Sequence, residues 1–142
     1  MLEQDKSYEA DNRTGLNHEG ANANRPVQRL TATSIIGDEV ENTKGDKLGK
    51  IDNLMINLST GQVEYAVIEH GGLLGVGAKL FAIPFDELQV DEVKECFILN
   101  RDKDYVKESP GFDANHWPAT NDHSYFDSVN SYYNRPPVTP FP

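Results

Sequence analysis

The sequence predicts an all-β domain, a small barrel of about five to six antiparallel strands with one short helix. Short apolar runs recur at a spacing of roughly ten residues, which is typical of such domains. Polar and glycine-containing turns separate these runs, and the central run alternates apolar with polar side chains. Both ends of the chain differ in composition from this region. We therefore expect a domain over residues 29–118, between one tail at 1–28 and another at 119–142.

The first tail is rich in Asn, Asp, Glu and Gly, and its few apolar side chains are too scattered to form a face. We expect it to be disordered, because it cannot bury enough apolar surface to offset the entropy lost on ordering. The second tail is rich in Tyr and ends in a proline-rich run with a PxxP pattern from Pro137 to Pro140. Because prolines lack amide donors and favour extended chain, this tail is also expected outside the core.

The strongest structural signal is a hairpin in the centre of the domain. Leu54, Ile56 and Leu58 share one face of the first arm by the period of two. The second arm, residues 62–69, begins with the same alternation of apolar and polar side chains. Between the arms, Gly61 can adopt the positive φ that closes a hairpin turn.

Shorter patterns predict the remaining elements. Ile51 is out of phase with the first arm of the hairpin, which indicates a β-bulge near residues 52–53. Pro84 cannot donate to a strand ladder, so it should mark a strand end or an edge. Asp102 is a good cap for a short helix. Two further β-type runs and this helix are expected at residues 80–85, 95–100 and 102–107.

Three stretches of the domain carry a family resemblance. They are Leu48-Gly49-Lys50-Ile51-Asp52-Asn53-Leu54-Met55-Ile56 with its hairpin to Tyr65-Ala66-Val67, the glycine-rich segment 71–84, and Ser109-Pro110-Gly111-Phe112 running to Asn115-His116-Trp117-Pro118. In this order they resemble the PRC-barrel domain family, in the stand-alone bacterial form similar to the cytoplasmic domain of the photosynthetic reaction-centre H subunit. The resemblance implies a PRC-type β-barrel that serves protein–protein contact or assembly. It implies no catalytic residues.

Composition argues against several classes of function. A formal net charge of −10 and a pI near 4.7 repel phosphate backbones and anionic lipids, so we expect no direct nucleic-acid binding. No apolar run approaches the roughly 18 to 20 residues that cross a bilayer. The first residues do not resemble a signal peptide, so the cytoplasm is the expected location. The single cysteine, Cys96, lies in an apolar run and is expected to be a buried hydrophobe.

The glycine-rich loop, residues 71–79, is the most conspicuous motif. It lacks the Gly-Lys-Ser/Thr pattern of a phosphate-binding loop, and the segment after it reads as a strand. Its apolar side chains either pack back onto the barrel or stay exposed as a contact patch. On the second interpretation, the candidate partner surface consists of Leu73, Leu74, Val76, Lys79 and Phe81.

The sequence contains no pattern of a catalytic or metal site. The acidic and histidine side chains between residues 113 and 123 have no spacing of a closed metal site, and no Gly-x-Ser-x-Gly elbow occurs. We therefore predict no enzyme activity, no metal and no cofactor. Phe112 and Trp117 are expected to strap the chain across the barrel and to cover an open edge.

These observations give one leading hypothesis and two alternatives. The leading hypothesis is a non-enzymatic protein–protein interaction or assembly module, self-associating as a homodimer and related to stress physiology. Small barrels with exposed edges often self-associate, which favours the dimer. One alternative is a ribosome or RNA assembly factor, suggested by the family. The other is a small-ligand-binding protein or enzyme that uses the glycine-rich loop.

Overall fold

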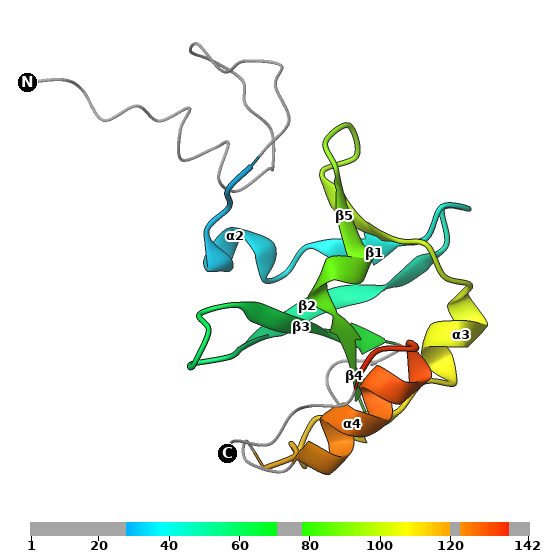
Figure 1. Cartoon of the computed structure of the whole chain (residues 1–142). Coiled ribbons are helices and arrows are strands. Elements are labelled where there is room, and N and C mark those ends of the chain that lie inside the picture. The colour runs from blue at the N-terminus through cyan, green and yellow to red at the C-terminus, as the bar shows by residue number, and fades with distance from the viewer. Residues whose placement is uncertain (1–27, 71–77, 120–122, 137–142) are drawn as a thin grey trace, which may run out of the picture.

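The computed structural model describes residues 28–70, 78–119 and 123–136. One twisted sheet organises them, with the strand order β5-β6-β1-β2-β3-β4-β7 (Figure 1). The strands are β1 (Glu39–Glu41), β2 (Lys47–Ile56), β3 (Val63–His70), β4 (Lys79–Pro84), β5 (Leu88–Asp91), β6 (Cys96–Leu99) and β7 (Gly111–Asp113). The helices are α2 (Ala32–Ile35), the 3₁₀ helix η1 (Phe85–Glu87), α3 (Lys103–Lys107) and α4 (His123–Tyr132).

This architecture confirms the predicted small all-β fold. The described sheet has seven strands, and β1 and β6 pair in parallel, whereas the sequence led us to expect five to six antiparallel strands. The strands that the named apolar runs did not include are β1, β5 and β7, which have only three or four residues and are too short to show an alternating pattern. β4 ends at Pro84, and the helix after Asp102 forms, both as predicted.

The β2–β3 hairpin also forms as predicted. Its register shifts between Ile51 and Asn53, so the expected bulge lies at Asp52. The bulge lies where β2 changes its partner strand. The residues up to Lys50 pair with β1, and those from Lys50 onward pair with β3. A sharply bent central strand of this kind wraps a small sheet around one core.

Gly49 permits the close approach of β2 and β3 at this bend. Its φ is +149°, and a Cβ atom built on it would lie 2.3 Å from the carbonyl oxygen of Glu69. Next to it, the Nδ1 atom of His70 lies 2.6 Å from the carbonyl oxygen of Leu48, so the imidazole N–H donates to the backbone. The bend therefore requires a residue without a side chain.

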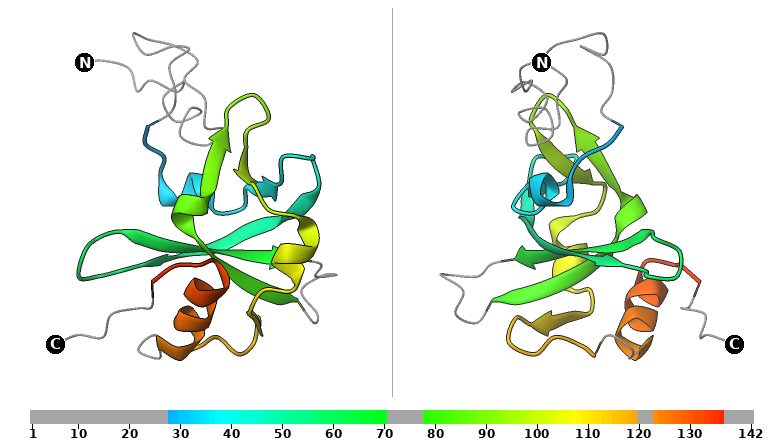
Figure 2. Two further views of the ribbon diagram at one scale, coloured as in Figure 1. Left: turned by 45° about the vertical axis from the view of Figure 1, so that its right-hand side comes forward. Right: turned by 90° about the vertical axis from the view of Figure 1, so that its left-hand side faces the viewer.

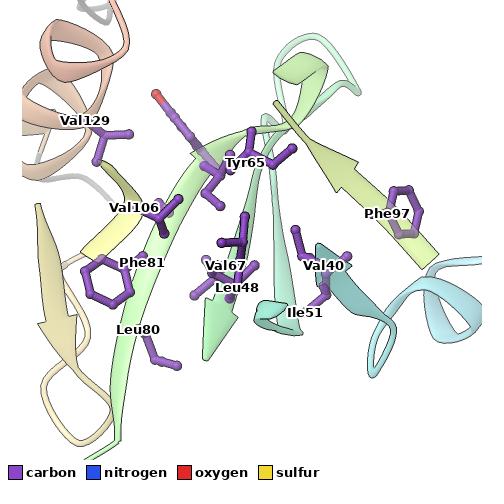
Figure 3. Packing of buried hydrophobic residues seen from close by; sticks show 14 of the residues in the cluster. Val40, Leu48, Ile51, Tyr65, Val67, Leu80, Phe81, Phe97, Val106 and Val129 are labelled. Atoms are coloured by element: carbon purple, nitrogen blue, oxygen red, sulfur yellow. The ribbon is translucent and has the colours of Figure 1, made fainter. Parts of the chain in front are cut away.

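The core lies between the sheet, α3 and α4. β3 and β4 are its centre, since Ala66, Ile68 and Ile83 are fully buried. Figure 3 shows Val106 of α3 and Val129 of α4 beside the strands, on the side toward which Tyr65 points. The largest fully buried side chains are Phe81, Leu48, Ile51, Ile68, Leu80, Ile83, Leu99, Val40, Val67, Val106 and Val129.

Helix α4 corrects the prediction of an extended tail over residues 119–142. Phe126, Val129 and Tyr133 are 8%, 0% and 2% exposed and belong to the core. Their spacing of three and four residues is that of one helix face. The helical period is short and is surrounded by Asn, Asp, Ser and Pro residues, so it does not stand out in the sequence. The isolated helix would be unstable, and packing against the sheet stabilises it.

The segment before α4 covers an edge of the sheet, as expected. β7 pairs with β4 through Gly111 and Phe112, and it thereby covers the edge of β4. The ring centroids of Phe112 and Trp117 are 4.9 Å apart in a T-shaped contact. Trp117 is 41% exposed, however, so it shields Phe112 from water and is not itself a core residue.

A partly buried carboxyl group stands at the start of β1. The backbone N–H of Asp38 donates to Ile35 at 3.0 Å, and its carbonyl oxygen accepts the N–H of Ile51 at 2.9 Å, so the residue cannot move away. Burial raises the pKa of the Asp38 carboxyl from 3.8 to about 6, and the charge of Glu95 adds to the effect. Ionisation of Asp38 therefore opposes folding.

We expect the substitution Asp38→Asn to stabilise the protein at pH 8 and not at pH 4. The folded state favours protonated Asp38, so this contribution to stability is complete below about pH 4 and is lost as the pH rises through about 6. The gain at pH 8 should be about 1 kcal/mol, less than the full shift implies because water screens a partly exposed carboxyl. Urea unfolding at both pH values measures it, with the exposed Asp52→Asn as the matched control. Equal pH dependence in wild type and Asp38→Asn would contradict the assignment.

Candidate interaction surface

The candidate surface around the glycine-rich loop divides into three parts. Leu73, Leu74 and Val76 lie outside the described residues. Lys79 is exposed, and its Nζ atom lies 5.6 Å from the centroid of the Phe81 ring. Phe81 is 1% exposed, so its inclusion in a contact surface was wrong. Phe81 is buried because it belongs to β4, an interior strand of the sheet with β3 on one side and β7 on the other. Every side chain of β4 from Leu80 to Pro84 is buried.

The structure exposes apolar side chains at the free end of the β2–β3 hairpin. Leu58, in the turn, is 94% exposed, and Ile56, at the end of β2, is 50% exposed. Ile56 pairs across the hairpin with Val63, which is half-buried. We call these three residues the hairpin end. The left view of Figure 2 shows that this part of the hairpin projects beyond the rest of the described chain.

Sequence reasoning assigned Leu54, Ile56 and Leu58 to one face of a strand but did not identify them as surface. The first of them packs against the core, while the strand ends at Ile56 and the turn carries Leu58 into solvent. One feature of the sequence does indicate an exposed contact surface here. Residues 53–63 contain no charged side chain, although 25% of the whole chain is charged.

The turn that presents Leu58 is held by its own hydrogen bonds. Gly61 has a φ of +76°, and its N–H donates to the carbonyl oxygen of Asn57 at 2.8 Å. The side-chain oxygen of Asn57 accepts the N–H groups of Ser59 and Thr60 at 2.8 and 3.2 Å. This is an Asx-type turn, and the Asn57 side-chain amide also donates to the Glu64 carboxylate at 3.2 Å. Leu58 is therefore presented on an ordered turn.

A groove of about 760 Å³ lies beside the hairpin end. The beginning of β3, the segment after β4 and the end of α4 line it, and it is open to solvent. Val63 belongs to both the hairpin end and the groove. The residues that line the groove are Gln62, Val63, Glu64, Tyr65, Pro84, Phe85, Asp86, Asn130, Arg135 and Pro136.

Tyr65 lines one wall of the groove and connects it to helix α4. Its hydroxyl donates to the side-chain oxygen of Asn130 at 2.9 Å, and its ring stacks on Phe126 at a centroid distance of 4.8 Å. Burial raises the pKa of Tyr65 to about 12, so the hydroxyl stays protonated at neutral pH. The neutral, hydrogen-bonded phenol makes this wall of the groove rigid.

Ion pairs fix the segment that follows α4 against η1. Arg135 donates to Asp86 at 2.6 Å and to Glu87 at 2.9 Å, and Glu87 also accepts Arg101 at 3.0 Å. Burial alone would raise the pKa of Glu87, but hydrogen bonds and charges from the two arginines outweigh it and hold that pKa below its usual value. These contacts set the position of Arg135, and with it one side of the groove.

Two tyrosines tie α3 to the same end of α4. The Tyr105 hydroxyl donates to the carbonyl oxygen of Tyr132 at 2.7 Å, and the Tyr132 hydroxyl donates to the carbonyl oxygen of Tyr105 at 2.6 Å. The guanidinium of Arg101 lies 4.6 Å from the Tyr105 ring centroid. Arg101 is thus held by Glu87 and an aromatic ring, and it forms part of the scaffold.

Two observations concern metal-binding and nucleophilic side chains among the described residues. Among them, no three His, Cys, Asp or Glu side chains are grouped so that they could hold a metal ion. Cys96 is buried, and burial together with the charges of Glu41 and Asp91 raises the pKa of its thiol. A protonated buried thiol is a poor nucleophile. Within the same residues, no helix has the length and apolar character required to cross a membrane.

Comparison with known proteins assigns the family. The profile of the PRC-barrel domain matches residues 28–106, which include β1 to β6 and most of α3. A search of curated proteins found no match. β7 and α4 lie beyond the matched segment, although α4 completes the core. Since the matched segment is more than half of the sequence and the fold agrees with it, the chain belongs to the PRC-barrel domain family.

Proposed function

We propose that the protein is a non-enzymatic protein–protein interaction or assembly module that binds its partner through the hairpin end. The observation that carries the proposal is the 94% exposure of Leu58 on a run of residues, 53–63, that has no charge. The centres of protein–protein interfaces are depleted of charged residues, and clustered exposed apolar side chains often mark them. Self-association and a role in the cytoplasm, in stress physiology, belong to the same proposal.

The scaffold supports this use of the hairpin. An ordered turn presents Leu58, and the β2–β3 ladder connects it to strands buried in the core. Contacts placed on rigid elements lose little entropy on binding. The hairpin end offers a projecting apolar element, and beside it lies a groove lined by both polar and apolar side chains.

The alternative of a ribosome or RNA assembly factor gains no support from the described charges. Lys44, Arg101 and Arg135 each have a carboxylate partner within 3.0 Å, at Asp102, Glu87 and Asp86 respectively. Phosphate binding at these three side chains would require the pairs to separate, in a chain of net charge −10. The other alternative depends on the glycine-rich loop, of which residues 71–77 lie outside the described part of the chain.

Affinity capture from native lysate tests the proposal, with a tag on the amino terminus of the full chain. We expect the substitution Leu58→Gln to abolish recovery of the specific partner. The matched control is Val93→Gln, because Val93 is 92% exposed in a different turn. Both changes remove one exposed aliphatic side chain and add no charge. Equal recovery of the partner by wild type and both variants would contradict the role of the hairpin end.

A further inference from the structure

We propose that the partner of the hairpin end is a second copy of this chain, with Leu58 of each copy seated in the groove of the other. The proposal rests on the interaction role proposed above and names the partner of that surface. It commits to a homodimer with twofold symmetry. In such a dimer each contact between the two surfaces occurs twice.

Charge favours this occupant. Two copies each carry a net charge of −10, so they repel one another over most approaches. Two other hairpin turns that the structure describes are charged: residues 43–47 contain Lys44, Asp46 and Lys47, and residues 91–95 contain four charged side chains. The hairpin end, in contrast, lies within residues 53–63, which carry no charged side chain. A neutral apolar surface is where two acidic copies can meet at the lowest electrostatic cost, whereas a basic partner would be drawn to the acidic surfaces.

Geometry favours reciprocal insertion. A twofold contact requires each copy to carry both the inserted element and its receptor. The hairpin end and the groove meet that requirement, because Val63 belongs to both and its cross-strand neighbour is the exposed Ile56. The groove, at about 760 Å³, is large enough to admit the side chain of Leu58 together with its turn. Phe85 and Pro136 provide apolar surface within it.

Polar groups in the groove complement the inserted turn. The turn carries Ser59, Thr60 and Gln62, which are exposed and uncharged. The rim of the groove contains Glu64 and Asp86 as acceptors and Arg135 as a donor. Neutral hydroxyl and amide groups can bond to either sign of charge. The turn itself therefore brings no charge into the groove.

Sedimentation velocity of the purified full chain over a wide range of concentrations tests the proposal. We expect a reversible monomer–dimer equilibrium. The substitution Leu58→Gln should raise the dimer dissociation constant by about tenfold or more, as for a central interface residue. Val93→Gln should leave it unchanged. Both positions are almost fully exposed, so circular dichroism and thermal unfolding should show that both variants fold normally.

A charge placed in the groove gives a second, independent readout. Gln62 is exposed and lines the groove, and the substitution Gln62→Glu adds one negative charge to each copy close to the contact. We expect it to weaken the dimer at low ionic strength and to recover most of the lost affinity at high salt, because salt screens exposed charges. Added salt should also strengthen the wild-type dimer.

Two results would overturn the homodimer. One is a chain that stays monomeric at every concentration, and the other is a dimer that Leu58→Gln and Gln62→Glu leave unaltered. If the purified chain is monomeric while capture from lysate still depends on Leu58, the hairpin end binds a different protein. The interaction role then stands and the homodimer fails. If neither experiment depends on Leu58, both proposals fail.

Discussion

A chain that ends at Ala119 should lose most of its stability. It would lack Phe126, Val129 and Tyr133, whose burial contributes roughly 1.5 to 3 kcal/mol each, and it would expose the sheet beneath them. We expect the free energy of unfolding to fall by more than about 4 kcal/mol, which is comparable to the total stability of many small domains. Urea unfolding followed by circular dichroism measures the loss.

The matched control ends the chain at Pro136 and keeps all of α4. It should unfold at nearly the same urea concentration as the full chain, since the aromatic contacts and the Arg135 ion pairs are retained. If the chain that ends at Ala119 were as stable as this control, α4 would be a surface appendage and not part of the core. The folding unit would then end after β7, which lies beyond the PRC-barrel match to residues 28–106.

The substitution Gly49→Ala should be the most damaging single-methyl change in the described sheet. The new Cβ atom would lie 2.3 Å from the carbonyl oxygen of Glu69, which is backbone and cannot rotate away. The φ of +149° adds strain for any L side chain. We expect a loss of about 3 kcal/mol or more, because β2 and β3 must separate at the bend. Thermal unfolding of both proteins measures it.

Gly45→Ala is the control that isolates the steric clash. Gly45 also has a positive φ, +85°, but no heavy atom within 4 Å would meet its Cβ atom. This variant should lose only about 1 kcal/mol, from backbone strain alone. Comparable losses in the two variants would show that conformation, and not the close approach of the strands, explains the glycine at position 49.

Local patterns in the sequence predict the centre of this fold well. The β2–β3 hairpin, the bulge at Asp52 and the end of β4 at Pro84 each follow from period, phase or a missing donor. The short helix after Asp102 follows from a cap residue, although the Asp102 carboxylate accepts Lys44 at 3.0 Å and makes no capping bond. Such features depend on near neighbours, so a single sequence contains them.

The errors concern contacts between distant segments. The residues of α4 have weak intrinsic helix propensity, and the helix forms because Phe126 and Tyr133 pack against the core. No local sequence pattern shows that this packing surface exists. Phe81 was assigned to the surface because it follows the glycine-rich loop, yet it lies in a continuous apolar run, which is typical of a strand buried on both faces. Leu58 shows the opposite error, since alternation alone cannot tell a projecting strand end from a core strand.

The exit of the chain beside the groove matters for labelling. Pro136 lines the groove, so a fluorophore, purification tag or fused domain placed close after it would lie beside the groove. The described chain begins at Gln28 near α2, on the opposite side of the sheet from α4 (Figure 2). Reporters for imaging or capture therefore belong on the amino-terminal side of Gln28, away from the groove.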